Sequence, residues 1–98
     1  MYRGTTPTIK LTIQGLSDID ISKIYLTLKQ FDTVIEKDLD SLHINGNILS
    51  YTFSQEETLS LSEAKVELQV RILSKSGVAY ATKKMALQVS DILKEGVI

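Results

Sequence analysis

The fold is decided by one stretch, Lys65-Val66-Glu67-Leu68-Gln69-Val70-Arg71-Ile72-Leu73. Aliphatic side chains alternate there with charged or polar ones, and this period of two is typical of a β-strand with one buried face. The alternation is the most regular in the chain. It predicts a central strand whose core face carries Val66, Leu68, Val70 and Ile72.

The same period appears on both sides of this stretch. It predicts strands over residues 8–14, with Ile9, Leu11 and Ile13 inward, and over residues 23–30. Residues 33–38 suit a half-exposed or edge strand. Residues 48–53 place Leu49, Tyr51 and Phe53 on one core face, and residues 78–89 predict a last long strand with a bulge near Lys83-Lys84.

Turn signals separate these strands. Asn45-Gly46-Asn47 lies between apolar runs and predicts a tight hairpin, because Asn and Gly tolerate positive φ. Ser74 to Gly77 predicts the turn before the last strand. Ser54 followed by Glu57 matches a capping box, which predicts one helical turn over residues 55–61.

Together these segments predict a single all-β domain over residues 1–98. About six or seven strands joined by short polar turns, with at most one short helical turn, favour an antiparallel two-sheet sandwich of immunoglobulin-like form. A small barrel is the alternative, since alternation does not distinguish closure from stacking. Residues 1–7 form an N-terminal arm and residues 91–98 a C-terminal tail.

Composition excludes several classes of function. The 98 residues carry a formal net charge of -1 and no cysteine. The balanced charge argues against nucleic acid as a partner, and the lack of thiols excludes a disulfide framework, a thiolate metal site and a thiol nucleophile. No window is apolar enough for a membrane span, and the opening residues lack a signal-peptide core, so synthesis in the cytoplasm is expected.

Catalytic and metal-binding groups are sparse. His43 is the only histidine and is expected to be a solvent-facing strand residue, and the nearby Asp38 and Asp40 do not complete a ligand set. No phosphate-binding loop or nucleophile elbow is present. The sequence therefore predicts no enzyme activity, no cofactor and no metal.

Candidate interaction residues fall into two groups. Of the four tyrosines, Tyr25 and Tyr80 are the better surface candidates, because tyrosine combines a large contact area with a polar end. The tail has no obvious strand register for its apolar side chains, which are therefore candidates for contact with a neighbouring molecule: Ile92, Leu93, Val97 and Ile98. The alternative is that both ends of the chain pack on their own domain.

Four segments carry a resemblance to known proteins. Residues 2–8 and 91–98 look like the two ends of a family of small phage and prophage proteins from Gram-positive bacteria, and residues 53–59 and 66–71 resemble that family's middle segments. More loosely, the chain resembles the immunoglobulin-like domain at the start of phage baseplate upper proteins.

The resemblance implies a structural role in the virion, in the tail or baseplate region. The implied partners are other phage structural proteins or further copies of the chain, and no catalytic residues are carried over. The alternative function is a ligand-binding module that recognises a cell-surface glycan or a host protein through the strand face bearing Tyr25 or through the loops.

Overall fold

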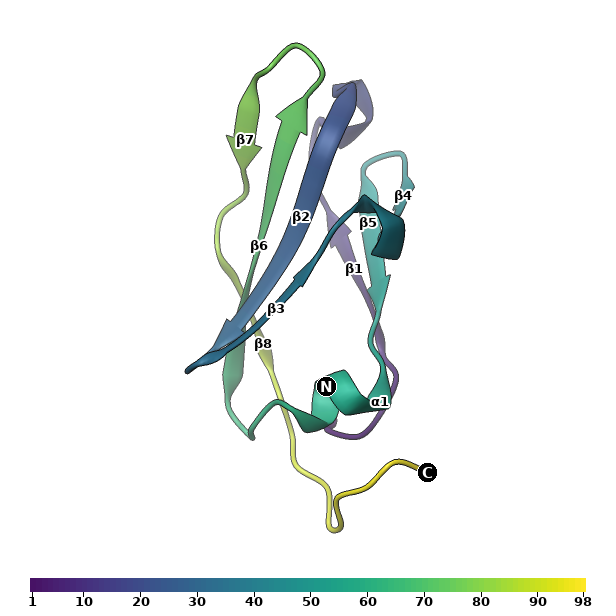
Figure 1. The fold of residues 1–98 in the computed structure, drawn as a ribbon, viewed down its shortest axis with the longest axis vertical. Helices are drawn as coiled ribbons and strands as arrows, with labels where there is room; N and C mark the ends of the chain where they lie inside the picture. The colour runs from purple at the N-terminus through teal and green to yellow at the C-terminus, as the bar shows by residue number, and fades with distance from the viewer.

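The computed structural model describes all residues from Met1 to Ile98 and consists of two antiparallel sheets that face each other (Figure 1). The smaller sheet has the order β1 (Thr8–Thr12), β5 (Ile48–Thr52), β4 (His43–Asn45). The larger sheet has the order β3 (Thr33–Lys37), β2 (Ile21–Gln30), β6 (Lys65–Ser74), β7 (Ala79–Ala81), with β8 (Met85–Gln88) also paired to β6. The helical segments are η1 (Leu16–Asp18), η2 (Leu39–Ser41) and α1 (Gln55–Leu59).

The connectivity is that of an immunoglobulin-like sandwich. The chain passes from one sheet to the other at the β1–β2, β3–β4 and β5–β6 connections, and the β2–β3, β4–β5 and β6–β7 connections are hairpins within a sheet. No named strand of one sheet pairs with a named strand of the other. The prediction of an all-β two-sheet sandwich is confirmed, and the barrel alternative is wrong because the sheets stay separate.

The β2–β6 pair forms the centre of the larger sheet. Its inward residues meet in register as Ile24 opposite Ile72, Leu26 opposite Val70 and Leu28 opposite Leu68. All six are at most 4% exposed, so each inward position of both strands is removed from water. The predicted central strand and its core face are confirmed.

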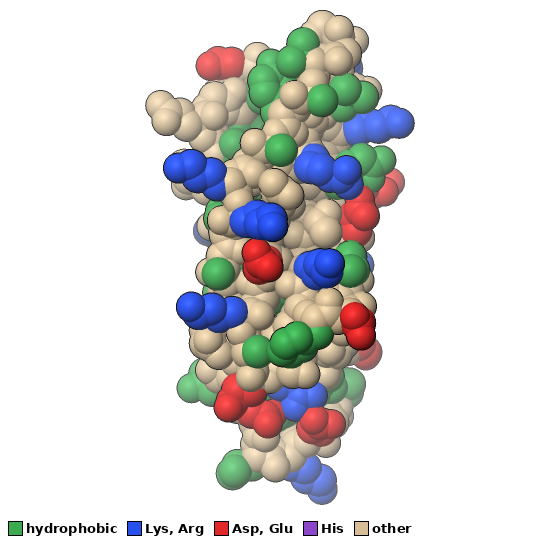
Figure 2. All heavy atoms as spheres, turned by 90° about the vertical axis from the view of Figure 1, so that its left-hand side faces the viewer, with side chains coloured by type: hydrophobic (Ala, Val, Ile, Leu, Met, Phe, Trp, Pro, Cys, Tyr) green, Lys and Arg blue, Asp and Glu red, His purple; other side chains and the backbone are tan.

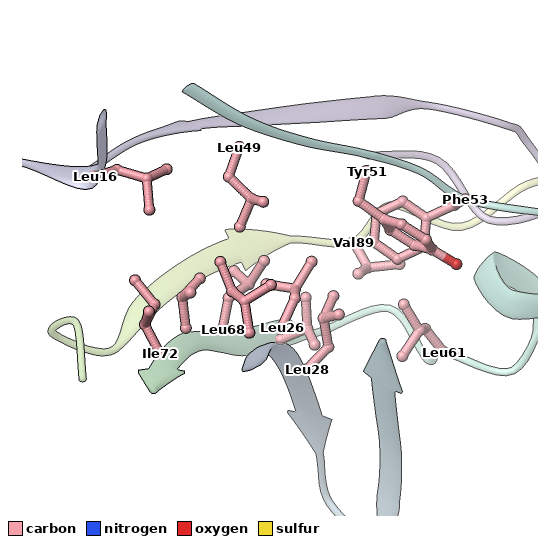
Figure 3. Close-up of a cluster of buried hydrophobic side chains, with 13 residues drawn as sticks. Leu16, Leu26, Leu28, Leu49, Tyr51, Phe53, Leu61, Leu68, Ile72 and Val89 are labelled. Carbon is pink, nitrogen blue, oxygen red and sulfur yellow. The ribbon is translucent and has the colours of Figure 1, made fainter. Parts of the chain in front are cut away.

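The smaller sheet supplies the opposite layer of the core (Figure 3). Leu49, Tyr51 and Phe53 are buried there, and the rings of Tyr51 and Phe53 meet edge to face at a centroid distance of 5.0 Å. Ile9, Leu11 and Ile13 are partly buried against this cluster, as expected for an edge strand. The predicted aromatic part of the core is confirmed.

The segment after the β6–β7 turn differs from its prediction. Residues 78–89 form two short strands, β7 and β8, instead of one long strand, which raises the count to eight. Thr82 lies at the break, where its Oγ1 accepts from Val70 N at 3.0 Å and its own N–H donates to Val70 O at 2.9 Å. A side-chain oxygen thus replaces one backbone partner, and this local irregularity lies beside the bulge expected at Lys83-Lys84.

The predicted turns are confirmed. Gly46 and Gly77 have φ of 61° and 89°, values at which a residue with a Cβ atom is disfavoured. The helix α1 is a single turn closed by the capping box of Ser54 and Glu57. Each helical segment has five residues or fewer, and none is long and apolar enough to cross a membrane.

Candidate interaction surface

Several exposed large apolar side chains lie at the two ends of an elongated molecule measuring 48 × 24 × 18 Å, and others lie on β3, η2 and β5. We call the end that holds α1, the β2–β3 turn and residues 91–98 the tail end, and the end that holds the β6–β7 turn the hairpin end (Figure 1). Five large apolar residues are exposed at the tail end: Tyr2, Phe31, Leu93, Val97 and Ile98. Both ends therefore have apolar surface that remains exposed after folding.

Residues 1–3 pair with the end of β8 and the chain that follows it. Met1 N donates to Gln88 O at 2.9 Å, Ser90 N to Met1 O at 2.7 Å, and Arg3 N to Ser90 O at 2.9 Å. Tyr2 and Ser90 form a parallel bridge. The start of the expected N-terminal arm thus lies on its own domain, which was the alternative for this end of the chain.

The side chain of Arg3 joins three segments at the tail end. Its Nε donates to Leu61 O at 2.5 Å and its Nη2 to Leu59 O at 2.8 Å, which satisfies the last carbonyl of α1 and one just after it. Its Nη1 donates to Asp91 Oδ1 at 2.8 Å and to Glu95 Oε1 at 2.6 Å. One guanidinium therefore fixes the start and middle of the tail to the sandwich.

Asp91 and Ile92 anchor the base of the tail. The hydrogen bond from Arg3, followed by one from the backbone of Ile92, lowers the pKa of the Asp91 carboxyl below its ordinary value. Ile92 is half-buried, and a Cβ atom on Gly4 would lie only 3.0 Å from Ile92 Cδ1. Among the four apolar tail residues, Ile92 is therefore the one that packs on its own domain.

The far part of the tail is held by backbone contacts and turns its side chains outward. Ile98 N donates to Gln55 Oε1 at 2.8 Å, which returns the chain to the start of α1. Leu93 and Ile98 are fully exposed and Val97 is more than half exposed. Polar groups thus hold this segment while its apolar side chains face water, the reverse of the arrangement in a core.

A partly buried polar network near the tail end links the two sheets. Tyr51 Oη donates to the carboxylate of Glu57 at 2.6 Å, and Lys37 Nζ lies 3.0 Å from Glu57 Oε2. Burial acts to raise the pKa of Glu57, but hydrogen bonds from Tyr51, Ser54 and Lys37 outweigh it and lower that pKa. Burial, with Glu57 as a second cause, raises the pKa of Tyr51.

This network ties β3, β5 and α1 together, and its groups bind one another. The capping-box pattern predicted the helical turn, but nothing in the sequence predicted that Tyr51 and Lys37 reach Glu57. Such a meeting depends on how the two sheets stack. We therefore assign the network to the structure of the sandwich.

A hollow of about 370 Å³ lies on the outer face of the larger sheet at the hairpin end. It is lined by two rows of side chains that run across β2, β6 and β7 in register: Lys23, Leu73, Ala79 and Tyr25, Arg71, Ala81. Figure 2 shows apolar side chains near the top of this face and Lys and Arg side chains below them. The hollow is therefore apolar with a basic rim.

Tyr25 and Tyr80 both border this hollow, but they lie on different faces of the sheet. Tyr25 lies opposite Arg71, whose guanidinium carbon is 5.7 Å from the Tyr25 ring centre. Tyr80 lies opposite Ile72, a core residue, and opposite residues share one face of a sheet. The two tyrosines predicted as surface candidates therefore stand on opposite faces of the sheet, although both border the hollow.

A second, more polar hollow of about 220 Å³ lies farther along the same face. Lys29, Arg71 and Lys84 line it together with Glu36 and Glu67, and Arg71 Nη2 lies 3.2 Å from Glu36 Oε1. The charges thus alternate in sign along the strands and largely compensate one another. This surface offers no concentrated charge for a single ionic ligand.

The structure holds no cluster of metal-ligating side chains. His43 is exposed on β4, as expected, and no three His, Asp or Glu side chains lie close enough together to hold a metal ion. In comparisons with known proteins, no family model, no curated protein and no solved structure matches the chain. The surfaces described above are therefore the basis for a functional proposal.

Proposed function

We propose that this chain is a phage or prophage structural protein of the tail or baseplate region that acts by protein–protein assembly and catalyses no reaction. The observation that carries the proposal is the tail, which Arg3 holds through the Glu95 carboxylate and Gln55 holds through the Ile98 backbone. Leu93, Val97 and Ile98 nevertheless face solvent. These side chains are not buried on folding, and exposed apolar clusters on small proteins are typical of contact sites.

Two further features support the proposal. The molecule is 48 Å long and exposes apolar side chains at both ends, a geometry suited to a module within an extended assembly. The resemblance of residues 2–8 and 91–98 to phage and prophage proteins points to a particle as that assembly. The first site of action would be the host cytoplasm, followed by the virion.

The test is whether the protein is incorporated into particles through its tail. The full chain and the Leu93→Asp and Val97→Asp variants are produced in the prophage-carrying host, particles are purified on a density gradient, and the protein in the particle band is quantified. We expect the wild-type chain in the band and a loss of roughly tenfold or more for either variant, because a charge replaces an apolar contact.

Val34→Asp is the matched control, since Val34 is also exposed but lies on β3. It should be incorporated like the wild-type chain. Thermal unfolding of all variants should be unchanged, which separates lost assembly from lost folding. If the protein is absent from the particles, the structural role is wrong; if the tail variants are incorporated normally, the tail is not the contact.

The hollow beside Tyr25 favours a second candidate function, recognition of a cell-surface glycan or host protein. An aromatic ring with a flanking guanidinium is common where sugars or peptides bind. Glycan-array binding by the wild-type chain that disappears in Tyr25→Ala would support this function. No binding at high protein concentration would count against it.

A further inference from the structure

We propose that the tail of one copy docks into the hollow at the hairpin end of a second copy. This inference rests on the proposed assembly function and names both the partner and its surface. The two surfaces lie at opposite ends of the 48 Å long axis, as Figure 1 shows for residues 91–98 and the β6–β7 turn. Arg3 and Gln55 also hold the tail on its own domain at the tail end. The tail therefore reaches the hollow of a neighbouring copy and not the hollow of its own chain.

The shape of the hollow suits an extended apolar segment. Ala79 and Ala81 occupy the β7 end of both lining rows, where longer side chains would close the space. Leu73 and the ring of Tyr25 supply larger apolar walls. The hollow therefore has room for one or two aliphatic side chains of the size of Leu93 or Val97.

The charges of the two surfaces are complementary. Lys23 and Arg71 border the hollow. Glu95 lies between Leu93 and Val97 in the tail, and its side chain stays 67% exposed although it contacts Arg3. An inserted tail would bring this carboxylate to the basic rim, which orients the segment as well as attracting it.

A contact between two different surfaces is heterologous, so each copy has one free tail and one free hollow until a ring closes or a filament grows. A segment of eight residues buries less area than a standard interface, and association is expected only at high protein concentration, ~100 μM or above. In a particle, neighbouring contacts would raise the effective concentration.

The decisive experiment mixes two blocked variants. Leu93→Asp removes the tail contact, and Ala81→Glu fills the hollow and repels Glu95, while Arg71 opposite residue 81 keeps the new carboxylate compatible with folding. Each full-length variant is studied by sedimentation velocity up to about 1 mM, alone and in an equimolar mixture, with Ala79→Glu as a second hollow variant.

We expect the wild-type chain to form species larger than a dimer, each variant alone to stay monomeric, and the mixture to form a one-to-one dimer through the one intact tail and the one intact hollow. A wild-type chain that stays monomeric at the highest concentration overturns the inference. So does a mixture that stays monomeric, or an Ala81→Glu or Ala79→Glu chain that still associates.

The outcomes also separate this inference from the proposed function. If copies do not associate but the tail variants are still lost from particles, the tail binds another virion protein and only the inference fails. If copies associate head to tail but the protein never enters particles, self-association stands and the virion role fails.

Discussion

The β2–β6 pair and the tail use apolar side chains in opposite ways. In the pair, inward residues such as Leu26 and Val70 are fully buried while polar side chains face outward. In the tail, the guanidinium of Arg3 binds a carboxylate, the amide of Gln55 binds the backbone, and the side chains of Leu93 and Ile98 face water. This difference shows that the β2–β6 pair stabilises the fold, whereas the apolar side chains of the tail remain accessible for contact with another molecule.

The physical basis of this division lies in the kind of force. Apolar burial contributes about 25 cal/mol per Å² and needs no particular direction, so it dominates wherever the two sheets stack. Hydrogen bonds and ion pairs near the surface contribute little net stability but require defined geometry. Hydrogen bonds and ion pairs therefore position the tail, although its apolar side chains are not buried in the core.

The largest difference in stability should appear when Leu is replaced by Ala once in the β2–β6 pair and once in the tail. Leu26→Ala removes a fully buried side chain and should lower the free energy of unfolding by about 2–5 kcal/mol through lost burial and a cavity. Leu93→Ala should change it by less than about 0.5 kcal/mol. Urea unfolding measures both; a comparable loss for Leu93→Ala would mean that the tail is part of the core.

The next largest loss of stability should come from the polar network around Glu57. Glu57→Gln removes the charge that accepts hydrogen bonds from Tyr51 and Ser54 and contacts Lys37, and should cost about 1–3 kcal/mol. Glu56→Gln is the matched control, because Glu56 is the exposed neighbour in the same turn. Equal unfolding midpoints for the two variants would show that the network adds no stability.

A smaller effect of opposite sign is expected at the β2–β3 turn. Phe31 has φ of 52° and is 73% exposed, a conformation that disfavours a bulky side chain. Phe31→Asn should raise the free energy of unfolding by about 1 kcal/mol, because Asn tolerates the left-handed region. A lower urea midpoint would instead show that the Phe31 ring makes stabilising contacts at the tail end.

Acidification should loosen the tail end before the β2–β6 pair. The folded-state pKa values of Asp91 and Glu57 are lowered, so the stability they contribute is fully present above pH 4.5, the ordinary Glu pKa, and is lost as the pH falls through the lowered values. Amide hydrogen exchange of residues 91–98, followed from pH 6 to 3 relative to β6, would measure this.

Asp91→Asn is the control for that titration, because it removes the titrating carboxyl that contacts Arg3. Its tail should exchange quickly at every pH. Protection of the wild-type tail that persists unchanged to pH 3 would contradict the role assigned to the ion pair.

Much of the fold was predictable because its signals are local. The alternation at residues 65–73 and 23–30, the Asn45-Gly46 turn and the capping box of Ser54 each depend on residues adjacent in sequence, and the structure confirms them. The break between β7 and β8 was missed because Thr82 substitutes its side chain for a backbone partner, an arrangement without a distinctive sequence pattern.

The candidate site was predictable only in part. Leu93, Val97 and Ile98 were singled out because no strand register accommodates them, and they are exposed. Ile92 proved to be packed against Gly4, which brings together residues 88 positions apart. The separation of Tyr25 from Tyr80 became visible only once the register of β6 and β7 was known.

The amino-acid sequence by itself determined which residues form strands and which faces of those strands are apolar, because strand period and turn chemistry act over a few residues. Only the tertiary structure decided that Arg3 meets Asp91 and Glu95, that Glu57 meets Tyr51, and that two rows of side chains enclose a hollow. These contacts join residues distant in sequence, and their formation depends on how the sheets stack and on the register in which strands pair.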